Sequence, residues 1–461
     1  HLFDHGASPV LKLRDGGEHN EIIDANTHQL ELILKPFKDF RVVGSASYKS
    51  SNNFRQWYHV PFFNHDVNEV PYNGSDGTES RVNEYAFKSD YYNLDLYSDY
   101  EFDLKGHNLK VMVGGQYESF SQRDITGERT GLISTDIQSL STTTGIDSRG
   151  AEIAPILLGG YDEWAVGGFF GRLNYNYKHR YLLEANLRYD GSSRFRKDNR
   201  WLFVPSFSIG WNISEEDFFN VDIVDQLKVR ASYGSLGNQN THYWYPTYIT
   251  QPVGVQNGSW LVSGSRPNTS YAPGLLSQDL TWEKVESFNY GLDFALLNSK
   301  LSGSFDYFVR NTLDMVGPGE ELPNVLGASV PSRNNTDLQT YGWDFSIGWN
   351  DRVDLGRNQL HYGVTLTLSD SQTEVTKYPN KTNSLSTFRE GQKLGEIWGY
   401  ETIGIAKTDE EMKSHVASLP EGGQFGLSTL GAGDIMYKDL NNDGRISPGA
   451  NTLDNPGDRK I

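Results

Sequence analysis

Apolar and polar side chains alternate along many stretches of this sequence. In the clearest stretch, Tyr341, Trp343 and Phe345 alternate with Gly342 and Asp344. A period of two residues is typical of a β-strand that has one apolar and one polar face. Runs of this kind predict twelve strands, near residues 29–34, 38–48, 91–103, 107–120, 164–177, 181–190, 200–213, 226–234, 282–295, 300–311, 340–350 and 359–369.

The connections between these strands alternate between short and long. The short ones are 35–37, 104–106, 178–180, 214–225, 296–299 and 351–358. The long ones are 49–90, 121–163, 191–199, 235–281 and 312–339, with another after residue 369. Transmembrane β-barrels have short turns at one rim and long loops at the other, because antiparallel neighbours return to the same rim at every second connection. We therefore expect an all-β chain that supplies about twelve strands of a transmembrane antiparallel β-barrel with long extracellular loops.

Aromatic residues recur near both ends of the predicted strands. Trp201 and Trp211 lie on the same face of one strand, and Tyr341 and Trp349 repeat the arrangement. At ~3.3 Å per residue and ~40° of tilt, ten residues span about 25 Å along the membrane normal, the height expected between two aromatic girdles. Pro205 lies between the two tryptophans and predicts a bulge or a local end of pairing, because it has no N–H to donate.

Composition narrows the possible classes of protein. The chain has 461 residues with 26 Tyr, 23 Phe, 10 Trp and 47 Gly, which favours strands and turns. A net charge of −18 argues against a nucleic-acid partner, which requires a basic face. The chain has no Cys, so disulfides, thiol catalysis and Cys-ligated metals are excluded. No run of about 18 apolar residues predicts a transmembrane helix.

The alternation stops after residue 369, and 370–461 is expected to form a long extracellular loop. Within it, Thr408 and Glu411 have the spacing of a helix capping box. Apolar residues follow at helical spacing, namely Met412, Val416 and Leu419. We expect a short helix whose apolar side packs locally inside this loop.

A possible cation site occurs in the same segment. Asp439, Asn441, Asp443 and Gly444 have the D-x-N-x-D-G spacing of a calcium loop, in which oxygen ligands surround a hard cation. The twelfth position is Ala450 rather than the usual bidentate Glu. The alternative is a turn whose side chains bond to their own backbone. Calcium at Asp439, Asn441 and Asp443 is thus the one candidate cofactor, and both interpretations stay open.

The long connections are rich in aromatic and amide side chains. Aromatic rings stack on sugar rings or pack on peptides, while amides supply directional hydrogen bonds. The alternative is that these rings only pack loop against loop. The candidate substrate-binding residues are Trp57, Tyr58, Tyr243, Trp244, Tyr245 and Trp260.

The sequence does not predict an enzyme. Paired carboxylates such as Glu215 and Glu216 are adjacent, and adjacent residues in a strand face opposite ways. The chain has no H-E-x-x-H, Walker A or G-x-G-x-x-G motif. We expect no catalytic residues.

Five segments, taken together and in this order, resemble the SusC/RagA family of TonB-dependent outer-membrane transporters of Bacteroidota. They are residues 181–195, 205–218, 227–238, 280–284 and 433–446. The resemblance covers essentially the whole chain and is weakest over 1–160. It implies the middle of a 22-stranded barrel with a plugged lumen. The family's plug domain, TonB box and last strands are expected to lie outside these 461 residues.

The resemblance also implies a function and partners. The expected function is active import of a large nutrient, an oligosaccharide or oligopeptide, by a multi-pass protein of the outer membrane. The implied partners are a SusD-like surface lipoprotein and TonB, reached through the plug, in a dimer of transporter–lipoprotein pairs. The alternatives are a secreted β-rich carbohydrate-binding or glycan-degrading protein, or a passive porin. The alternation of short and long connections favours the barrel, and a requirement for detergent would distinguish it from a secreted protein.

Overall fold

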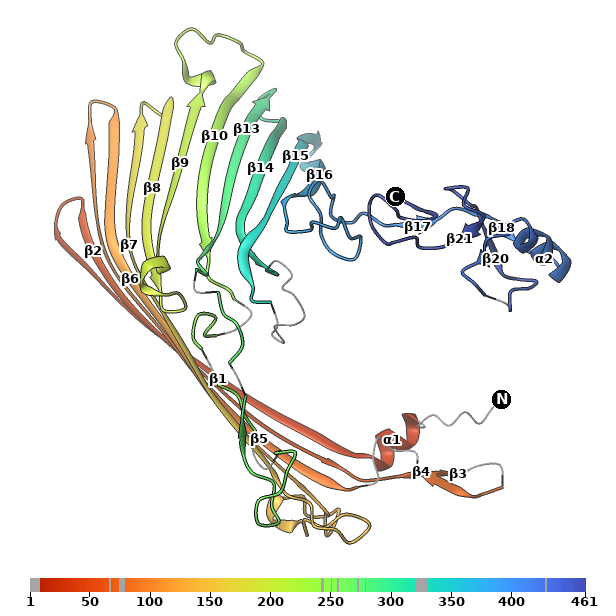
Figure 1. Ribbon diagram of the computed structural model, residues 1–461. Coiled ribbons are helices and arrows are strands. Elements are labelled where there is room, and N and C mark those ends of the chain that lie inside the picture. The colour runs from red at the N-terminus through yellow and green to blue at the C-terminus, as the bar shows by residue number, and fades with distance from the viewer. Residues whose placement is uncertain are drawn as a thin grey trace. The chain divides into compact units, whose positions relative to one another are not determined.

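The computed structural model describes residues 9–65, 68–73, 79–241, 244–249, 251–254, 257–271, 273–277, 279–319, 330–427 and 429–461. Within them, twelve long strands form one antiparallel sheet whose strand order follows the chain order (Figure 1). They are β1 (Gly17–Phe37), β2 (Phe40–His59), β5 (Arg81–Leu104), β6 (His107–Thr130), β7 (Ile156–Tyr177), β8 (Tyr181–Ser192), β9 (Trp201–Asn212), β10 (Val224–Asn238), β13 (Glu283–Leu296), β14 (Leu301–Gly317), β15 (Arg333–Leu355) and β16 (Asn358–Lys377). Each predicted strand corresponds to one of these, so the predicted strands and their order are confirmed.

The chain divides into two compact units. The first holds β1, β2 and the greater part of β5, β6 and β7, and the second holds most of β8 and all of β9 to β16 with the C-terminal segment. No helix among the described residues is long and apolar enough to cross a membrane.

In the first unit, the apolar face of the sheet has a clear boundary. Leu32 lies opposite Gly44, which lies opposite Leu96, and both leucines are exposed. Further along the same face, the rings of Tyr48 and Tyr92 stack at 4.9 Å. Directly beyond this aromatic pair, from Lys49 to Asn53, both faces of β2 are polar. The apolar band therefore ends at an aromatic row, as a membrane boundary would.

The long strands continue past this boundary. Just beyond Tyr48, Ser50 lies opposite Asp90, and the Asp90 carboxylate accepts the Tyr48 hydroxyl at 2.6 Å. Polar residues on both faces erase the alternation on which the prediction relied. The predicted loops 49–90 and 121–163 are therefore wrong in part, because β2, β5, β6 and β7 extend into them. The predicted loops 312–339 and 370–461 are also wrong in part, because β14 runs to Gly317, β15 begins at Arg333 and β16 runs to Lys377.

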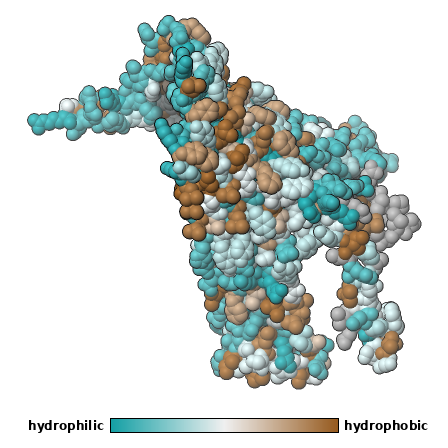
Figure 2. Space-filling model, turned by 90° about the vertical axis from the view of Figure 1, so that its left-hand side faces the viewer, coloured by the Kyte–Doolittle hydropathy of each residue, from teal (hydrophilic) through white to brown (hydrophobic). Residues whose placement is uncertain are grey.

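In the second unit, β9, β10, β13, β14, β15 and β16 pair in sequence. One cross-strand row on the apolar face runs from Val229 through Leu292, Phe305 and Phe345 to Leu368. Figure 2 shows apolar side chains gathered over the strands of the sheet. The ladder between β9 and β10 ends at Ser206, next to Pro205. The local end of pairing predicted at this proline is confirmed.

Two of the short connections show how the strands reverse in tight turns. Leu297, Asn298 and Ser299 all have positive φ between β13 and β14. Only Gly356 and Arg357 separate β15 from β16, because the strands extend beyond their predicted ends. The φ of Gly356 is 67°, a conformation that glycine adopts without steric cost.

Shorter elements occupy the N-terminal stretch, the long connections and the C-terminal segment. They are α1 (Pro9–Asp15), β3 (Phe63–His65), β4 (Pro71–Asn73), η1 (Leu140–Thr142), η2 (Lys197–Asn199), η3 (Ile213–Glu215), β11 (Val253–Gly254), β12 (Thr269–Ser270), β17 (Gly399–Tyr400), β18 (Thr402–Ile405), α2 (Asp409–Ala417), β19 (Gly423–Gln424), β20 (Ile435–Tyr437), β21 (Arg445–Ile446) and β22 (Arg459–Lys460).

Helix α2 is the helix predicted from the capping box. The Thr408 hydroxyl accepts the Glu411 N–H at 3.2 Å, and the Glu411 carboxylate accepts the Lys407 N–H at 2.7 Å. Met412 is fully buried and packs with Ala406 and Met436. The predicted helix, with its apolar side in a local core, is confirmed.

Candidate functional site

An ion cluster spans three strands on the polar face of the second unit. Arg230 of β10 donates from Nε to Asp293 of β13 at 3.1 Å and from Nη2 to Asp306 of β14 at 2.7 Å. The residue directly opposite Arg230 on β13 is Gly291. A Cβ there would lie 2.4 Å from Arg230 Cζ, so only glycine lets the guanidinium cross β13 in this position.

A second polar network joins β7 to β8. The Glu184 carboxylate accepts the side-chain amides of Asn174 at 2.5 Å and Asn186 at 2.8 Å. Asn186 in turn accepts Arg172 Nε at 2.5 Å. Each charged group here has partners of complementary character, so this part of the sheet presents fixed hydrogen-bonding groups rather than mobile charges.

A cavity of about 420 Å³ adjoins both networks. Its polar lining comes mainly from amides, hydroxyls and charged side chains, among them Asn108, Asn176, Glu184, Ser208, Lys228 and Asn289. Such groups can exchange hydrogen bonds with a hydroxyl-rich or amide-rich solute. Sequence reasoning missed this cluster, although its members stand at polar positions of the alternating strands, because the pairing register was unknown.

Two predicted substrate-binding residues lie in a strand rather than in a loop. Trp57 and Tyr58 belong to β2, where Trp57 lies opposite Asn83 and Tyr58 lies opposite the fully buried Val82. The predicted loop is wrong at this point, because the ladder with β5 continues to the end of β2. Both side chains are half-buried.

The other candidates lie in the second unit, apart from Tyr243, which falls outside the described residues. The ring of Tyr245 meets that of Tyr248 edge-on at 6.1 Å. Arg196 donates from Nε and Nη2 to the Thr247 carbonyl at 3.4 and 3.3 Å, which ties this segment to the β8–β9 connection. Trp244 is half-buried.

Trp260 is the most exposed of the five candidate rings that the structure describes. Its side chain lies in the β10–β13 connection and is 57% exposed. Nearby, the Asn257 amide donates to the Tyr271 hydroxyl at 2.8 Å and accepts the Thr269 hydroxyl at 2.7 Å, which holds the connection in shape. The role of all six candidate residues in substrate binding stays a prediction.

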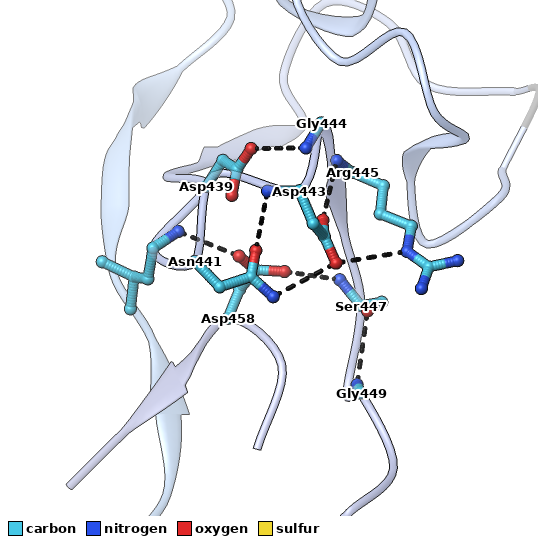
Figure 3. A network of polar contacts seen from close by, with 9 residues as sticks. Asp439, Asn441, Asp443, Gly444, Arg445, Ser447, Gly449 and Asp458 are labelled. Atoms are coloured by element: carbon cyan, nitrogen blue, oxygen red, sulfur yellow. Dashed lines mark hydrogen bonds and ion pairs between the residues drawn. The ribbon is translucent and has the colours of Figure 1, made fainter. Parts of the chain in front are cut away.

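The D-x-N-x-D-G loop is held by its own hydrogen bonds (Figure 3). Asp439 accepts the Gly444 N–H at 2.9 Å, and Asn441 accepts the Asp443 N–H at 3.0 Å. The fully buried Asp458 carboxylate accepts two further backbone N–H groups, at 2.9 and 2.8 Å. The Asx-turn interpretation of this loop is confirmed.

Calcium at this loop stays a prediction. The described residues contain no group of three or more His, Cys, Asp or Glu side chains that could hold a metal ion. The side chains that could bind a cation at this loop are the carboxylates of Asp439 and Asp443 and the amide of Asn441. The Asp443 carboxylate also accepts the Asn441 amide N–H at 3.1 Å.

One carboxylate links three parts of the C-terminal segment. Glu401 accepts Lys460 Nζ at 2.6 Å and Lys438 Nζ at 3.3 Å. The hydrogen bond from Lys460, followed by that from Lys438 and by the charges of both, holds the pKa of Glu401 below its ordinary value. The ionised form of Glu401 is therefore the one that the fold favours.

This is a two-faced antiparallel sheet with an apolar band, an aromatic boundary, and short turns that alternate with long loops. Such a sheet is typical of a protein that crosses a membrane with its strands. A family model described as "TonB dependent receptor-like, beta-barrel" matches residues 14–454. The chain belongs to this family, and it is an outer-membrane protein.

Curated relatives confirm the resemblance to SusC. The chain is 28% identical to the TonB-dependent receptor SusC of Bacteroides thetaiotaomicron over 344 residues, which cover 69% of this chain and 32% of SusC. It is 26% identical to the TonB-dependent receptor P3 of Formosa agariphila over 365 residues, 76% of this chain and 34% of the relative. The chain thus spans about a third of the length of the curated relatives it matches.

A solved structure confirms the fold. The chain is similar to the RagAB peptide importer in the "closed-closed" state, with a TM-score of 0.67 and 20% identity. The match covers 84% of this chain and 41% of the other. At this identity the similarity establishes the shared barrel architecture.

Proposed function

We propose that this chain forms part of the barrel wall of a TonB-dependent importer that carries a large polar nutrient across the outer membrane. The observation that carries the proposal is the contrast between the two faces of the sheet. One face exposes apolar and aromatic side chains, and the other carries connected polar networks such as Arg230 with Asp293 and Asp306.

The polar networks suit a transport wall. Arg230 is paired with two carboxylates, so a passing solute meets a bonded ion cluster with one net negative charge and no isolated charge that would hold it tightly. The amides beside Glu184 offer hydrogen bonds that are similar to those of water. A hydroxyl-rich or amide-rich solute can therefore exchange water for wall contacts at little net cost.

We propose an oligosaccharide or an oligopeptide as the substrate. Exposed rings such as Trp260 and Tyr245 would stack on it, together with Trp57, Tyr58, Tyr243 and Trp244. One similar structure supports the peptide alternative, since RagAB is named a peptide importer. SusC is named a TonB-dependent receptor, which supports the dependence on TonB. We also propose calcium at Asp439, Asn441 and Asp443 as a structural ion of the C-terminal segment.

The proposed partners follow from the resemblance to the SusC/RagA family. TonB would supply energy through a plug domain, and a SusD-like surface lipoprotein would close over the long loops, in a dimer of such pairs. We expect the protein to carry its substrate unchanged, with no catalysis and no nucleic-acid partner. The net charge of −18 supports the expectation that the protein does not bind nucleic acid.

Uptake by cells tests the proposal. Cells that carry the natural protein should deplete one oligosaccharide or oligopeptide from a mixture, and loss of TonB should abolish this depletion. Trp260→Ala should lower uptake at low substrate roughly fivefold, because stacking contributes about 1 kcal/mol beyond the area that it buries. Phe218→Ala removes a ring in the β9–β10 connection that is even more exposed than Trp260; it is the control and should leave uptake unchanged.

Two outcomes would contradict the proposal. Uptake that persists without TonB would indicate a passive porin. Release of shortened products into the medium would indicate a glycan-degrading protein.

A further inference from the structure

A groove lies on the apolar face of the second unit, on the side of the sheet away from the ion cluster. Its volume is about 740 Å³, within the ~300–1,000 Å³ typical of ligand pockets. Two cross-strand rows form it. In each row β10 contributes the smallest side chain, Val229 or Ala231.

Large side chains stand on both sides of these small ones. Trp211 lies opposite Val229 and Ile209 lies opposite Ala231, both on β9. On the other side, Tyr290 of β13 lies opposite Ala231, and Tyr307 of β14 lies opposite Tyr290. The groove therefore has a floor of short aliphatic side chains and walls of tall, mostly aromatic ones.

The groove lies near the rim of short turns. Trp211 is the penultimate residue of β9, and Val229 stands five residues from the start of β10. At ~3.3 Å per residue and ~40° of tilt, this places Val229 about 13 Å from the start of the strand along the membrane normal. The groove thus opens to the hydrocarbon of the leaflet on the short-turn side, which spans roughly half of ~30 Å.

The mouth of the groove carries charges of both signs. The Glu216 carboxylate accepts the Trp211 indole N–H at 2.9 Å and the Tyr181 hydroxyl at 2.5 Å. Arg180 pairs with Glu216 at 3.4 Å and with Asp217, whose side chain is 88% exposed. Glu215 is exposed beside them. An exposed carboxylate pair beside a guanidinium suits a zwitterion whose cationic end is the more accessible.

We propose that this groove holds one phospholipid with a zwitterionic aminoethyl headgroup, phosphatidylethanolamine, as a resident lipid. One acyl chain lies on Val229 and Ala231 between the aromatic walls. The ammonium group meets Asp217 and Glu215, and the phosphate lies toward Arg180. An anionic headgroup without the ammonium would face the excess of carboxylates. The proposal rests on the lipid-facing side of the sheet and does not depend on the substrate.

Native mass spectrometry of the protein extracted from its outer membrane tests this proposal. The natural protein is reconstituted into nanodiscs of equal phosphatidylethanolamine and phosphatidylglycerol and then released into mild detergent. It should retain one phosphatidylethanolamine at least fivefold more often than phosphatidylglycerol. Ala231→Trp, which fills the floor, should lower retention about tenfold. Ala46→Trp, at an exposed alanine on the apolar face of β2, is the matched control and should retain the lipid.

A second variant tests the headgroup separately and does not alter the groove. The double variant Glu215→Lys with Asp217→Asn should shift retention toward phosphatidylglycerol, because the mouth then carries excess positive charge. If Ala231→Trp fails to fold, Ala231→Leu serves with a smaller expected loss. Retention that is absent in the natural protein, equal for both headgroups, or lost equally in the Ala46→Trp control would overturn the proposal.

Discussion

Arg230 reaches Asp306 across an intervening strand because Gly291, directly opposite Arg230, has no side chain. Arg230 Cζ lies only 2.4 Å from the position that a Cβ of residue 291 would occupy, which is too close for a side chain there. From this position the Arg230 Nη2 donates to Asp306 at 2.7 Å. One glycine thus allows β10, β13 and β14 to share an ion cluster on the polar face. A variant that disturbs this contact therefore tests the pairing register of β10, β13 and β14.

Gly291→Ala should displace the guanidinium and break its bond to Asp306. We expect a loss of about 1–2 kcal/mol in the free energy of unfolding, because the bonds are charge-assisted but the groups are partly solvated. Urea titration of the protein in detergent, followed by tryptophan fluorescence, measures it.

Two variants serve as controls for this prediction. Gly234→Ala, also in the sheet, should cost less, since its Cβ would meet Ser206 Oγ at an ordinary 3.5 Å. Combined with Arg230→Met, Gly291→Ala should cost little more. Equal costs in the presence and absence of Arg230 would contradict the proposed coupling.

The two faces of the sheet should respond differently to a charge. Phe345 stands in the apolar row of β15, and its neighbour Ser346 lies opposite Ser304 and Thr367 on the polar face. Phe345→Arg should cost roughly 2–4 kcal/mol, because the guanidinium would enter hydrocarbon. Ser346→Arg should cost less than about 1 kcal/mol. Refolding equilibria in lipid vesicles give both values, and similar values would contradict the assignment of the faces.

Strand position could be predicted where one face is apolar, and not where both are polar. Tyr341, Trp343 and Phe345 mark β15 by alternation alone. The outer part of β2 could not be found, because beyond Tyr48 the residues Ser50 and Asp90 face each other on the side that is apolar elsewhere. Propensity and pattern carry no information on a strand that is solvated on both faces.

Whether a candidate site could be predicted from the sequence depends on whether its residues lie close together along the chain. The capping box of α2 and the Asx turns around Asn441 are local in sequence, and both were predicted. The bond between Arg230 and Asp306 joins residues 76 positions apart, so only the pairing register reveals it. Trp260 was found from composition alone, which indicates an exposed ring but not its neighbours.

The C-terminal segment should loosen in acid through Glu401. The pKa of this carboxyl is lowered in the folded state by Lys460 and Lys438. Its contribution to stability is therefore fully present above about pH 4.5, the ordinary value, and is lost as the pH falls through the lower folded value. Hydrogen exchange of residues 399–461 should rise over that window. Glu401→Gln should remove this part of the pH dependence, and an unchanged profile in that variant would exclude Glu401 as its source.

The D-x-N-x-D-G loop should stay folded after chelation. Its backbone bonds to Asp439, Asn441 and the buried Asp458 do not require a metal. We expect EDTA to leave the hydrogen exchange of residues 439–447 unchanged. In contrast, Asp458→Ala should destabilise the loop by about 1–3 kcal/mol, because two backbone N–H groups lose their acceptor. Any calcium bound should have a dissociation constant near ~10⁻⁴–10⁻³ M and require Asp443. Binding that persists in Asp443→Ala would place the ion elsewhere.

The two rims of the sheet should face opposite sides of the outer membrane. The turn between β13 and β14 and the turn of Gly356 lie at one rim, while the long connection that carries Trp260 leaves from the other, because antiparallel neighbours return to the same rim at every second connection. In bacterial barrels the long loops face outward.

Protease added to intact cells should therefore cut near Trp260 and spare residues 296–299. A cysteine introduced by Ser259→Cys should react with an impermeant maleimide on intact cells, and one introduced by Asn298→Cys should react only after lysis. Both sites are solvated, so a difference in labelling reports sidedness rather than burial, and labelling of Asn298→Cys on intact cells would invert the topology on which the proposed route of the substrate depends.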